Sequence, residues 1–447
     1  TSHYKSYFSL LLLITSYDYG ELIQQSLLFY EAQRSGKLPS DQKVTWRKDS
    51  ALNDKGQNGE DLTGGYYDAG DYVKFGFPMA FTTTVLSWGI ISHENAYIKA
   101  NALDDAHKAV KWATDYFIKC HVSEYEFYGQ VGKGELDHDY WGRPEDMTMK
   151  RPAYKIDTQN PGSDLAAETA AALAATSIVF NNVNSSYSQT LLSHAKQLFE
   201  FADKYRGKYS DSITDADEYY GSSGYKDELV WAAAWLYKAT QDDSYLTKAE
   251  DMYDEFDLKS NDGSFDWDSK ATGAQNLCFY QKQQIKVKYY NRVEEYCDYL
   301  INDEKRTPKG LVFISEWGSL PSVAMASFIC LEAAKDGHYT NTYRNFAKEQ
   351  MGYILGDAGR SFVVGYGNNP PSHEQHASSS CPDAPATCDW DTFDGTQANY
   401  HVLYGALVAG PDSQDNYEDI RSDYVHNEVA CDYNAGFQSA LAALYDI

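Results

Sequence analysis

The stretch YEDIRSDYVHNEVACDYNA, residues 417–435, is the most informative part of this chain. Its acidic, aromatic and small residues surround Glu428. Taken alone, Glu428 reads as a glutamate at the N-terminus of a helix, where its charge interacts with the helix dipole. A carboxyl group buried beside Tyr424, Val425 and Val429 would instead have a raised pKa, and could act as a proton donor near neutral pH.

A second acidic cluster lies near the front of the chain, in LTGGYYDAGDYVKF, residues 62–75. On its own, an Asp-Ala-Gly-Asp run is usually a solvated turn, because Asp and Gly gather in turns for backbone reasons. Here four aromatic residues flank Asp68 and Asp71, which suits a sugar ring whose C–H face packs on aromatic rings. Acid/base hydrolysis of a glycosidic bond needs two such carboxyl groups, one to protonate the leaving oxygen and one to activate water.

From about Tyr17 to Leu444 the chain resembles glycoside hydrolase family 9, the endoglucanases of bacteria, plants and animals. The likeness includes WGRPE at 141–145, RPAY at 151–154 and PGSD at 161–164. It implies an all-α fold, the (α/α)6 toroid of six outer and six inner helices. The family's second signature matches at every defined position, namely Tyr417, Asp419, Tyr424, Glu428, Ala430, Asn434 and Ala435.

The resemblance assigns roles to three carboxyl groups. It implies that Asp71 is the general base, that Asp68 also holds the attacking water, and that Glu428 is the general acid. The implied activity is that of an inverting endo-β-1,4-glucanase, which hydrolyses internal bonds by single displacement. The alternatives are a non-catalytic or weakly active glucan-binding protein on the same toroid and, less favoured, a partner-binding solenoid of helices, which would not need paired acids flanked by aromatic rings.

The resemblance also implies contacts to a sugar chain. An open groove lined with aromatic rings suits internal cleavage of a polymer. A lone tryptophan is more often a core residue than a sugar platform, so a structural role stays open for each contact residue. The implied contacts are His138, Trp141, Tyr219, Trp317, His376 and Tyr433.

The sequence departs from its family at four positions. Gln375 and Ala377 stand where the first signature has His and Arg, and Pro321 and Met325 stand where Arg and Asn are expected. Arginine would offer forked hydrogen bonds to sugar hydroxyls or to a carboxylate. We therefore expect weaker substrate positioning, which favours the glucan-binding alternative, since misplacement can cost about 100-fold in rate.

A further acidic constellation, SGYKDE at 223–228, precedes an expected helix. Adjacent carboxylates and main-chain carbonyls suit a hard cation with oxygen ligands. The alternative is that Asp227 caps the helix. The resemblance implies a structural Ca²⁺, and no organic cofactor, with ligands from Ser223, Gly224, Asp227, Glu228 and Asp268.

Apolar residues recur at helical spacing along most of the chain, and alanine runs at 166–172 and 232–234 favour helix. Strand signals are few, as at 311–314. The long connections should carry the chemistry, because rigid helices hold loops in place. Helices are expected near 20–35, 79–91, 103–120, 164–181, 187–205, 227–240, 243–256, 287–302, 323–336, 341–355, 399–409 and 430–445.

The chain of 447 residues holds 65 acidic and 38 basic residues, a formal net charge of −27. Such a surface repels phosphate backbones and anionic lipid, so we expect a neutral glucan as partner and neither nucleic acid nor membrane. The alternative, that the negative charge serves only to keep the protein soluble, explains the composition equally well. No low-complexity linker is visible, so we expect residues 17–447 to form one catalytic domain, as a monomer.

The apolar run YFSLLLLITS, residues 7–16, follows Lys5 and is too short to span a bilayer. It is typical of the end of a secretory signal, so we read residues 1–16 as the remnant of one and expect a secreted protein. A buried helix or an artefact is the alternative. We find no other run long enough to cross a membrane.

Seven cysteines cannot all pair with one another. Cys381 and Cys388 flank a Pro-rich stretch and could form a disulfide in a secreted protein. None of the seven cysteines has the sequence spacing of a zinc site. The others lie in apolar or helical surroundings and are expected to be buried thiols: Cys120, Cys278, Cys297, Cys330 and Cys431.

Overall fold

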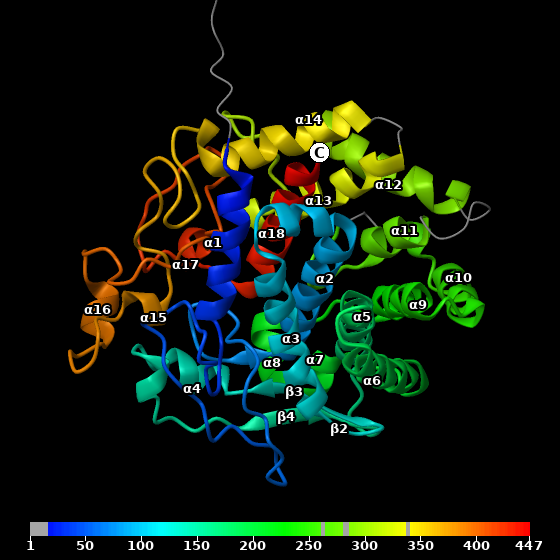
Figure 1. Cartoon of the computed structure of the whole chain (residues 1–447), viewed down its shortest axis with the longest axis horizontal. Helices are drawn as coiled ribbons and strands as arrows, with labels where there is room; N and C mark the ends of the chain where they lie inside the picture. The colour runs from blue at the N-terminus through cyan, green and yellow to red at the C-terminus, as the bar shows by residue number, and fades with distance from the viewer. Residues whose placement is uncertain (1–16, 261–263, 280–285, 337–339) are drawn as a thin grey trace, which may run out of the picture.

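The computed structural model describes residues 17–260, 264–279, 286–336 and 340–447. Twelve long helices within them form six hairpins of one outer and one inner helix each (Figure 1). The outer helices are α1 (Tyr19–Ala32), α3 (Leu103–Cys120), α6 (Ser185–Lys204), α10 (Asp243–Glu255), α12 (Lys286–Asn302) and α14 (Thr340–Gly352). The inner helices are α2 (Gly76–Lys99), α5 (Ser163–Phe180), α9 (Lys226–Thr240), α11 (Ala271–Phe279), α13 (Ser319–Ala333) and α18 (Cys431–Asp446).

The inner helices form a closed ring, because α18 packs against both α13 and α2. Inner helices such as α5 and α13 are buried on nearly every face, whereas the outer helices α3 and α6 bury one stripe. This double ring is the (α/α)6 toroid that the resemblance implied. Of the described helices, α5 alone is long and apolar enough to cross a bilayer, a run that the sequence reading overlooked; most of it is buried in the protein.

The predicted helix at 399–409 is wrong. Leu407 forms a β-bridge with Val363 there, and Gly405 has a φ of +77°. A short buried apolar run has the same pattern whether it is helical or extended, which is why periodicity misassigned it. The twelfth ring helix is α11, which lies where we expected a long connection.

The strand expected at 311–314 is also absent, since within it only Val312 pairs, in an isolated bridge with Arg306. A four-stranded antiparallel sheet lies elsewhere, and its β3 pairs with each of the other strands. Lys74 in this sheet lies opposite Val131, so the sheet anchors the chain just after Asp71. The strands are β1 (Lys74–Phe75), β2 (His121–Ser123), β3 (Glu126–Val131) and β4 (Ala153–Ile156).

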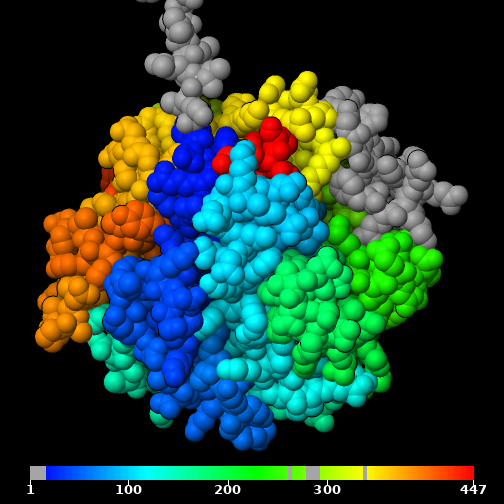
Figure 2. All heavy atoms as spheres, viewed as in Figure 1, coloured from blue at the N-terminus to red at the C-terminus, as the bar shows by residue number. Residues whose placement is uncertain are grey.

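Short helices lie in the connections between the ring helices. In Figure 1, α15, α16 and α17 lie on the same side of the molecule as α4. The Trp390 indole donates to the carbonyl of Asp139 at 3.2 Å, which joins α16 to the end of α4. Figure 2 shows the orange C-terminal loop region beside the blue N-terminal segment. The short helices are α4 (Gly134–His138), α7 (Tyr209–Ser212), α8 (Thr214–Tyr220), α15 (Ala377–Ser380), α16 (Trp390–Asp394) and α17 (Tyr424–Asn427).

Two disulfides are present among the described residues. Cys381 and Cys388 pair, as the sequence allowed. Cys297 and Cys330 also pair, so our prediction of buried thiols was wrong at these positions; packing of α12 on α13 brings their Cα atoms within 5.8 Å. Cys120 and Cys431 are buried thiols as expected. The side chain of Cys278 lies outside the described part of the chain.

Candidate active site

Glu428 directly follows the short helix α17, so it does not lie at a helix N-terminus. Its Oε2 atom accepts hydrogen bonds from the Trp317 indole at 3.0 Å and the Tyr433 hydroxyl at 2.9 Å. Burial raises the pKa of Glu428 to about 7, against these two hydrogen bonds, and the negative charge of Asp71 adds to the rise. The carboxyl group can therefore hold a proton near neutral pH, as an acid catalyst must.

Asp71 is bound by a histidine from α4. His138 Nε2 lies 2.8 Å from Asp71 Oδ2. This hydrogen bond raises the pKa of His138 to about 9, so the ring is protonated at neutral pH. Asp71 Oδ1 is buried and has no hydrogen-bond partner among the described residues. It can accept a hydrogen bond from a water molecule, which is what a general base does first.

Asp68 is buried beside this pair. The Tyr220 hydroxyl donates to Asp68 Oδ2 at 2.6 Å, and burial followed by the charge of Asp432 raises the pKa of Asp68 well above its usual range. Sequence analysis missed Asp432, whose own pKa is raised to about 7, by burial first and by Glu428 second. It lies in the first turn of α18, where an acidic residue normally indicates only a favourable helix dipole contact.

Close backbone contacts bring the two acidic segments together. The Ala377 N–H donates to the Gly70 carbonyl at 2.9 Å, and the Gln375 N–H donates to the Asn427 carbonyl at 2.9 Å. A Cβ atom at Gly70 would lie 2.1 Å from the Gln375 carbonyl oxygen, so only glycine permits this approach. Residues 375–377 therefore bridge the Asp68–Asp71 turn and the Glu428 segment.

Four of the predicted sugar contacts lie beside these carboxyl groups. Trp317 is 50% exposed, and its ring lies 5.4 Å from that of the exposed Tyr424. Tyr219 packs edge-on against the exposed His138, with ring centroids 5.0 Å apart. Tyr433 is buried and reaches the site only through its hydroxyl. Aromatic rings thus flank both ends of the carboxyl cluster.

The two other predicted sugar contacts, His376 and Trp141, are buried, and their contact with a sugar stays a prediction. His376 is 2% exposed, and both its ring nitrogens are engaged, with the Gln33 amide oxygen at 2.8 Å and the Ser379 N–H at 3.0 Å. The His376 ring caps the short helix α15. Trp141 is 8% exposed, its ring lies 5.9 Å from that of the more exposed Trp390, and its indole donates to the Ser380 hydroxyl at 3.0 Å.

The four departures from the family lie in varied surroundings. Ala377 is buried in a cluster with Tyr67 and other rings, and Met325 is buried. Gln375 is half-buried, as is Pro321 in the first turn of α13. None of the four carries a positive charge, so the two guanidinium groups expected there have no counterpart at these positions.

The predicted calcium ligands lie together but are partly engaged by the protein itself. Asp268 Oδ1 accepts from the Ser223 N–H at 2.9 Å, and Asp227 Oδ2 accepts from the Lys270 N–H at 2.6 Å. Lys270, fully buried, places its ammonium 3.2 Å from Glu228 Oε1. Glu228 Oε2 is buried without a hydrogen bond to any described residue, and burial, with the charge of Asp227, raises the pKa of Glu228 well above its usual range. The orphaned oxygen fits a cation.

The side chains among the predicted calcium ligands do not by themselves form a complete metal site. Within the described ranges, no group of three or more acidic, histidine or cysteine side chains is arranged as metal ligands. A Ca²⁺ ion would therefore depend on the carbonyls of Ser223 and Gly224 as well. The Gly224 carbonyl already accepts a hydrogen bond from the Ser222 hydroxyl at 2.6 Å.

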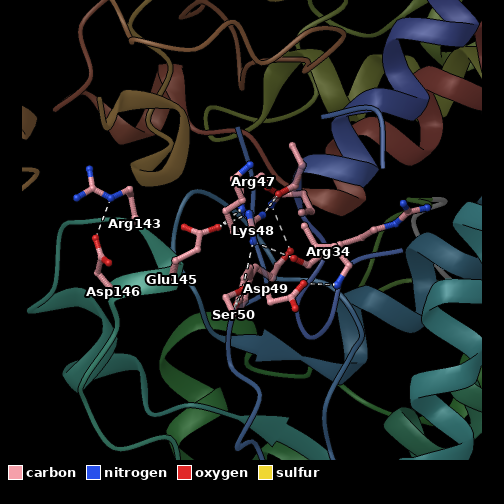
Figure 3. A network of polar contacts seen from close by, with 12 residues as sticks. Arg34, Arg47, Lys48, Asp49, Ser50, Arg143, Glu145 and Asp146 are labelled. Atoms are coloured by element: carbon pink, nitrogen blue, oxygen red, sulfur yellow. Dashed lines mark hydrogen bonds and ion pairs between the residues drawn. The ribbon is translucent and has the colours of Figure 1, made fainter. Parts of the chain in front are cut away.

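The WGRPE segment supports the site from outside. Glu145 accepts from Arg47 Nε at 3.2 Å and from the Lys48 N–H at 2.7 Å (Figure 3). The Arg47 guanidinium also lies over the Tyr67 ring, 5.6 Å from its centroid. Since Tyr67 precedes Asp68, this network fixes one end of the acidic turn.

The site combines a carboxyl group that holds a proton, a second carboxyl group bound by histidine, and flanking aromatic rings. On an (α/α)6 toroid, this combination is that of a glycoside hydrolase. The family model described as "Glycosyl hydrolase family 9" matches residues 19–441. The chain belongs to glycosyl hydrolase family 9.

Individual relatives agree with this assignment. Endoglucanase B of Cellulomonas fimi is 47% identical over 96% of this chain, and the chain spans 42% of that protein's length. The structure of an endoglucanase from the termite Nasutitermes takasagoensis is 64% identical, with a TM-score of 0.94 over 96% of this chain and 99% of that one. Endoglucanase CelQ from Clostridium thermocellum, solved with cellobiose and cellotriose, is 35% identical, with a TM-score of 0.84 over 96% of this chain and 71% of that one.

Proposed function

We propose that this protein is an inverting endo-β-1,4-glucanase. Asp71 is the general base, Asp68 helps to hold the attacking water, and Glu428 is the general acid. Water attacks the anomeric carbon while Glu428 protonates the leaving oxygen, and Asp71 takes the proton from the water. One displacement breaks the glycosidic bond and inverts the configuration.

The observation that carries this proposal is the contrast between Glu428 and Asp71. Glu428 has a pKa raised to about 7 and so keeps a transferable proton. Asp71 has one oxygen bound to a protonated histidine and one with no hydrogen-bond partner in the described part of the chain. Two carboxyl groups in different environments are how one site supplies both an acid and a base.

The substrate follows from the relatives and the surface. CelQ was solved with cellobiose and cellotriose, and the named relatives are endoglucanases. Exposed rings at Trp317 and Tyr424 suit the faces of successive glucose units. The net charge of −27 suits a neutral polymer.

Reducing-sugar release from carboxymethyl cellulose, together with the fall in its viscosity, tests the activity. An endo-acting enzyme lowers viscosity early, because each internal cut shortens the polymer. A protein that binds cello-oligosaccharides yet releases no reducing ends would support the glucan-binding alternative. Gln375→His, Ala377→Arg and Pro321→Arg together would then be the restoring variant.

Two subsidiary proposals complete the description. We infer a structural Ca²⁺ at Ser223, Gly224, Asp227, Glu228 and Asp268, supported by the buried Glu228 Oε2 atom, which forms no hydrogen bond with any residue that the structure describes. We also infer secretion, supported by two disulfides, which persist in oxidising compartments. Secretion of a full-length fusion into culture medium tests the second; a product retained inside the cell would contradict it. A monomeric state stays a prediction.

A further inference from the structure

The peptide bond that follows Asp71 is held by residues outside its own loop. The Tyr72 N–H, which belongs to that bond, donates to Asp137 Oδ1 at 2.9 Å. His138, the next residue of α4, binds the Asp71 carboxylate. Two adjacent residues of α4 thus hold the main chain and the side chain of Asp71.

Arg151 fixes the other side of Tyr72. Its Nη1 atom donates to the Tyr72 carbonyl at 2.8 Å and lies 3.6 Å from Asp137 Oδ2. Arg151 also holds both oxygens of Asp54, at 2.8 and 3.3 Å, and Asp54 in turn pairs with Lys74 at 2.8 Å. Charge-assisted, two-pronged contacts of this kind fix geometry more tightly than neutral hydrogen bonds do.

The whole set is buried. The side chains of Asp54 and Asp137 are 2% exposed, that of Arg151 is 9% exposed, and Lys74 is fully buried. Asp137 therefore cannot touch a sugar. The start of α4 is held separately, because Asp215 Oδ2 accepts from the Gly134 N–H at 3.0 Å. Nothing in the mechanism uses these charges directly, so their effect on the reaction must act through Asp71.

We propose that Asp137 is a positioning residue for the general base: with Arg151 it fixes the main chain on both sides of Tyr72 and so sets where the Asp71 carboxylate meets the attacking water. This inference rests on the proposed role of Asp71. A displacement of about 1 Å at such a group can cost about 100-fold in rate, so the contact matters more for turnover than for binding.

The test compares Asp137 variants on soluble cello-oligosaccharides. Asp137→Ala removes both contacts, and we expect kcat to fall about 30- to 100-fold with KM within about threefold. Asp137→Asn keeps an oxygen that accepts from Tyr72 N–H but places an amide nitrogen where Oδ2 lies near Arg151, so its loss should be intermediate, about three- to tenfold.

The matched control is Glu332→Gln. Glu332 is 3% exposed and lies 2.8 Å from His93, in a buried network of α2 and α13 that contains none of the site residues. The Glu332→Gln substitution should lower Tm while kcat stays within about twofold of wild type. A merely structural role for Asp137 predicts the same pattern in Asp137→Ala, lower Tm with unchanged kcat, and would overturn the inference.

A second readout separates the base from the acid. A dinitrophenyl cello-oligosaccharide has a leaving group that needs no proton, so Glu428→Gln should recover on it, whereas Asp137→Ala and Asp71→Asn should stay slow. Recovery of Asp137→Ala would overturn the inference. If that variant does not fold, Asp137→Asn and Arg151→Lys carry the same test, because lysine has no fork to hold both Tyr72 and Asp54.

The controls also separate this inference from the proposed function. Unchanged turnover in Asp71→Asn would refute the assignment of the base, and the inference with it. The expected loss in Asp71→Asn together with unchanged kcat in Asp137→Ala and Arg151→Lys refutes the positioning role alone.

Discussion

The imidazole of His138 lies 2.8 Å from the carboxylate of Asp71, Nε2 to Oδ2, and it comes from the helix that also holds the Asp71 main chain. Because the pKa of His138 is raised to about 9, a positive charge sits next to the base at neutral pH. This charge lies close to the carboxyl cluster, although the family's two expected arginines are absent.

We expect His138→Ala to lower kcat/KM about ten- to 100-fold, since a hydrogen bond between charged groups is lost beside the base. His138→Gln, which can still donate one hydrogen bond, should retain more activity than His138→Ala. Steady-state kinetics on cello-oligosaccharides checks this order. Equal activity in the two variants would show that the hydrogen bond to Asp71 has no role.

Glu428→Gln keeps the size of the side chain and removes its transferable proton. We expect hydrolysis of cello-oligosaccharides to fall by about 10²- to 10⁴-fold while binding persists. Calorimetric titration with a cello-oligosaccharide measures the binding, and product analysis measures the rate. Turnover close to that of wild type would remove Glu428 from the mechanism.

The pH dependence of kcat/KM should also report the ionisation of Glu428. Glu428 must be protonated to act, so kcat/KM should fall as pH rises above about 7. The hydrogen bonds from Trp317 and Tyr433 favour the ionised form and lower its pKa. Tyr433→Phe should therefore move the basic limb to higher pH, and a limb that stays in place or moves to lower pH would contradict the assignment.

Stability should also depend on pH through Glu374. This carboxyl is 1% exposed, and burial raises its pKa to about 7 from 4.5. Since the folded state holds a proton that the unfolded state releases, the free energy of unfolding should fall as pH rises from about 5 to 7, by on the order of 2 kcal/mol.

Urea denaturation at several pH values measures this effect. Glu374→Gln cannot ionise, so its free energy of unfolding should change less between pH 5 and 7 than that of wild type. The control Glu255→Gln removes an exposed carboxyl and should leave the slope unchanged. If the free energy of unfolding changes equally with pH in Glu374→Gln and in wild type, the proton held by the folded state is not on Glu374.

Chelation tests the calcium proposal. If Ca²⁺ is bound at Asp227 and Glu228, a chelator should lower Tm by several degrees and added Ca²⁺ should restore it, since a ligand bound only to the folded state stabilises it. Glu228→Gln should abolish the response. A Tm that does not change with chelator or added Ca²⁺ would mean that Lys270 alone balances these carboxylates.

The sequence predicted the ring of helices well, because eleven of its twelve helices carry a helical apolar pattern. It failed at 399–409 because buried extended segments and helices share short apolar runs. It also missed α11, because no helix was expected between those near 243–256 and 287–302. The Cys297–Cys330 disulfide depends on which helices are neighbours, which periodicity does not specify.

The candidate site was partly predictable for a similar reason. The family resemblance assigned roles to Asp68, Asp71 and Glu428, and the fold brings these three carboxyl groups close enough to affect one another's charge. The resemblance could not tell that His376 and Trp141 are buried, because exposure depends on how loops fold over each other. Asp137 and Asp432 carried no signal of their own, since an acidic residue in the first turn of a helix is ordinarily a surface residue.

The central claim is that hydrolysis proceeds by single displacement between Asp71 and Glu428, with the two carboxyl groups about 6.5–9.5 Å apart so that water fits between the base and the sugar. Proton NMR of the anomeric signals during the first minutes of cello-oligosaccharide cleavage tests it most directly. The account predicts that the new reducing ends appear first as the α-anomer, which then mutarotates toward the equilibrium mixture. Initial appearance of the β-anomer would mean a covalent intermediate and retention, and would contradict the account.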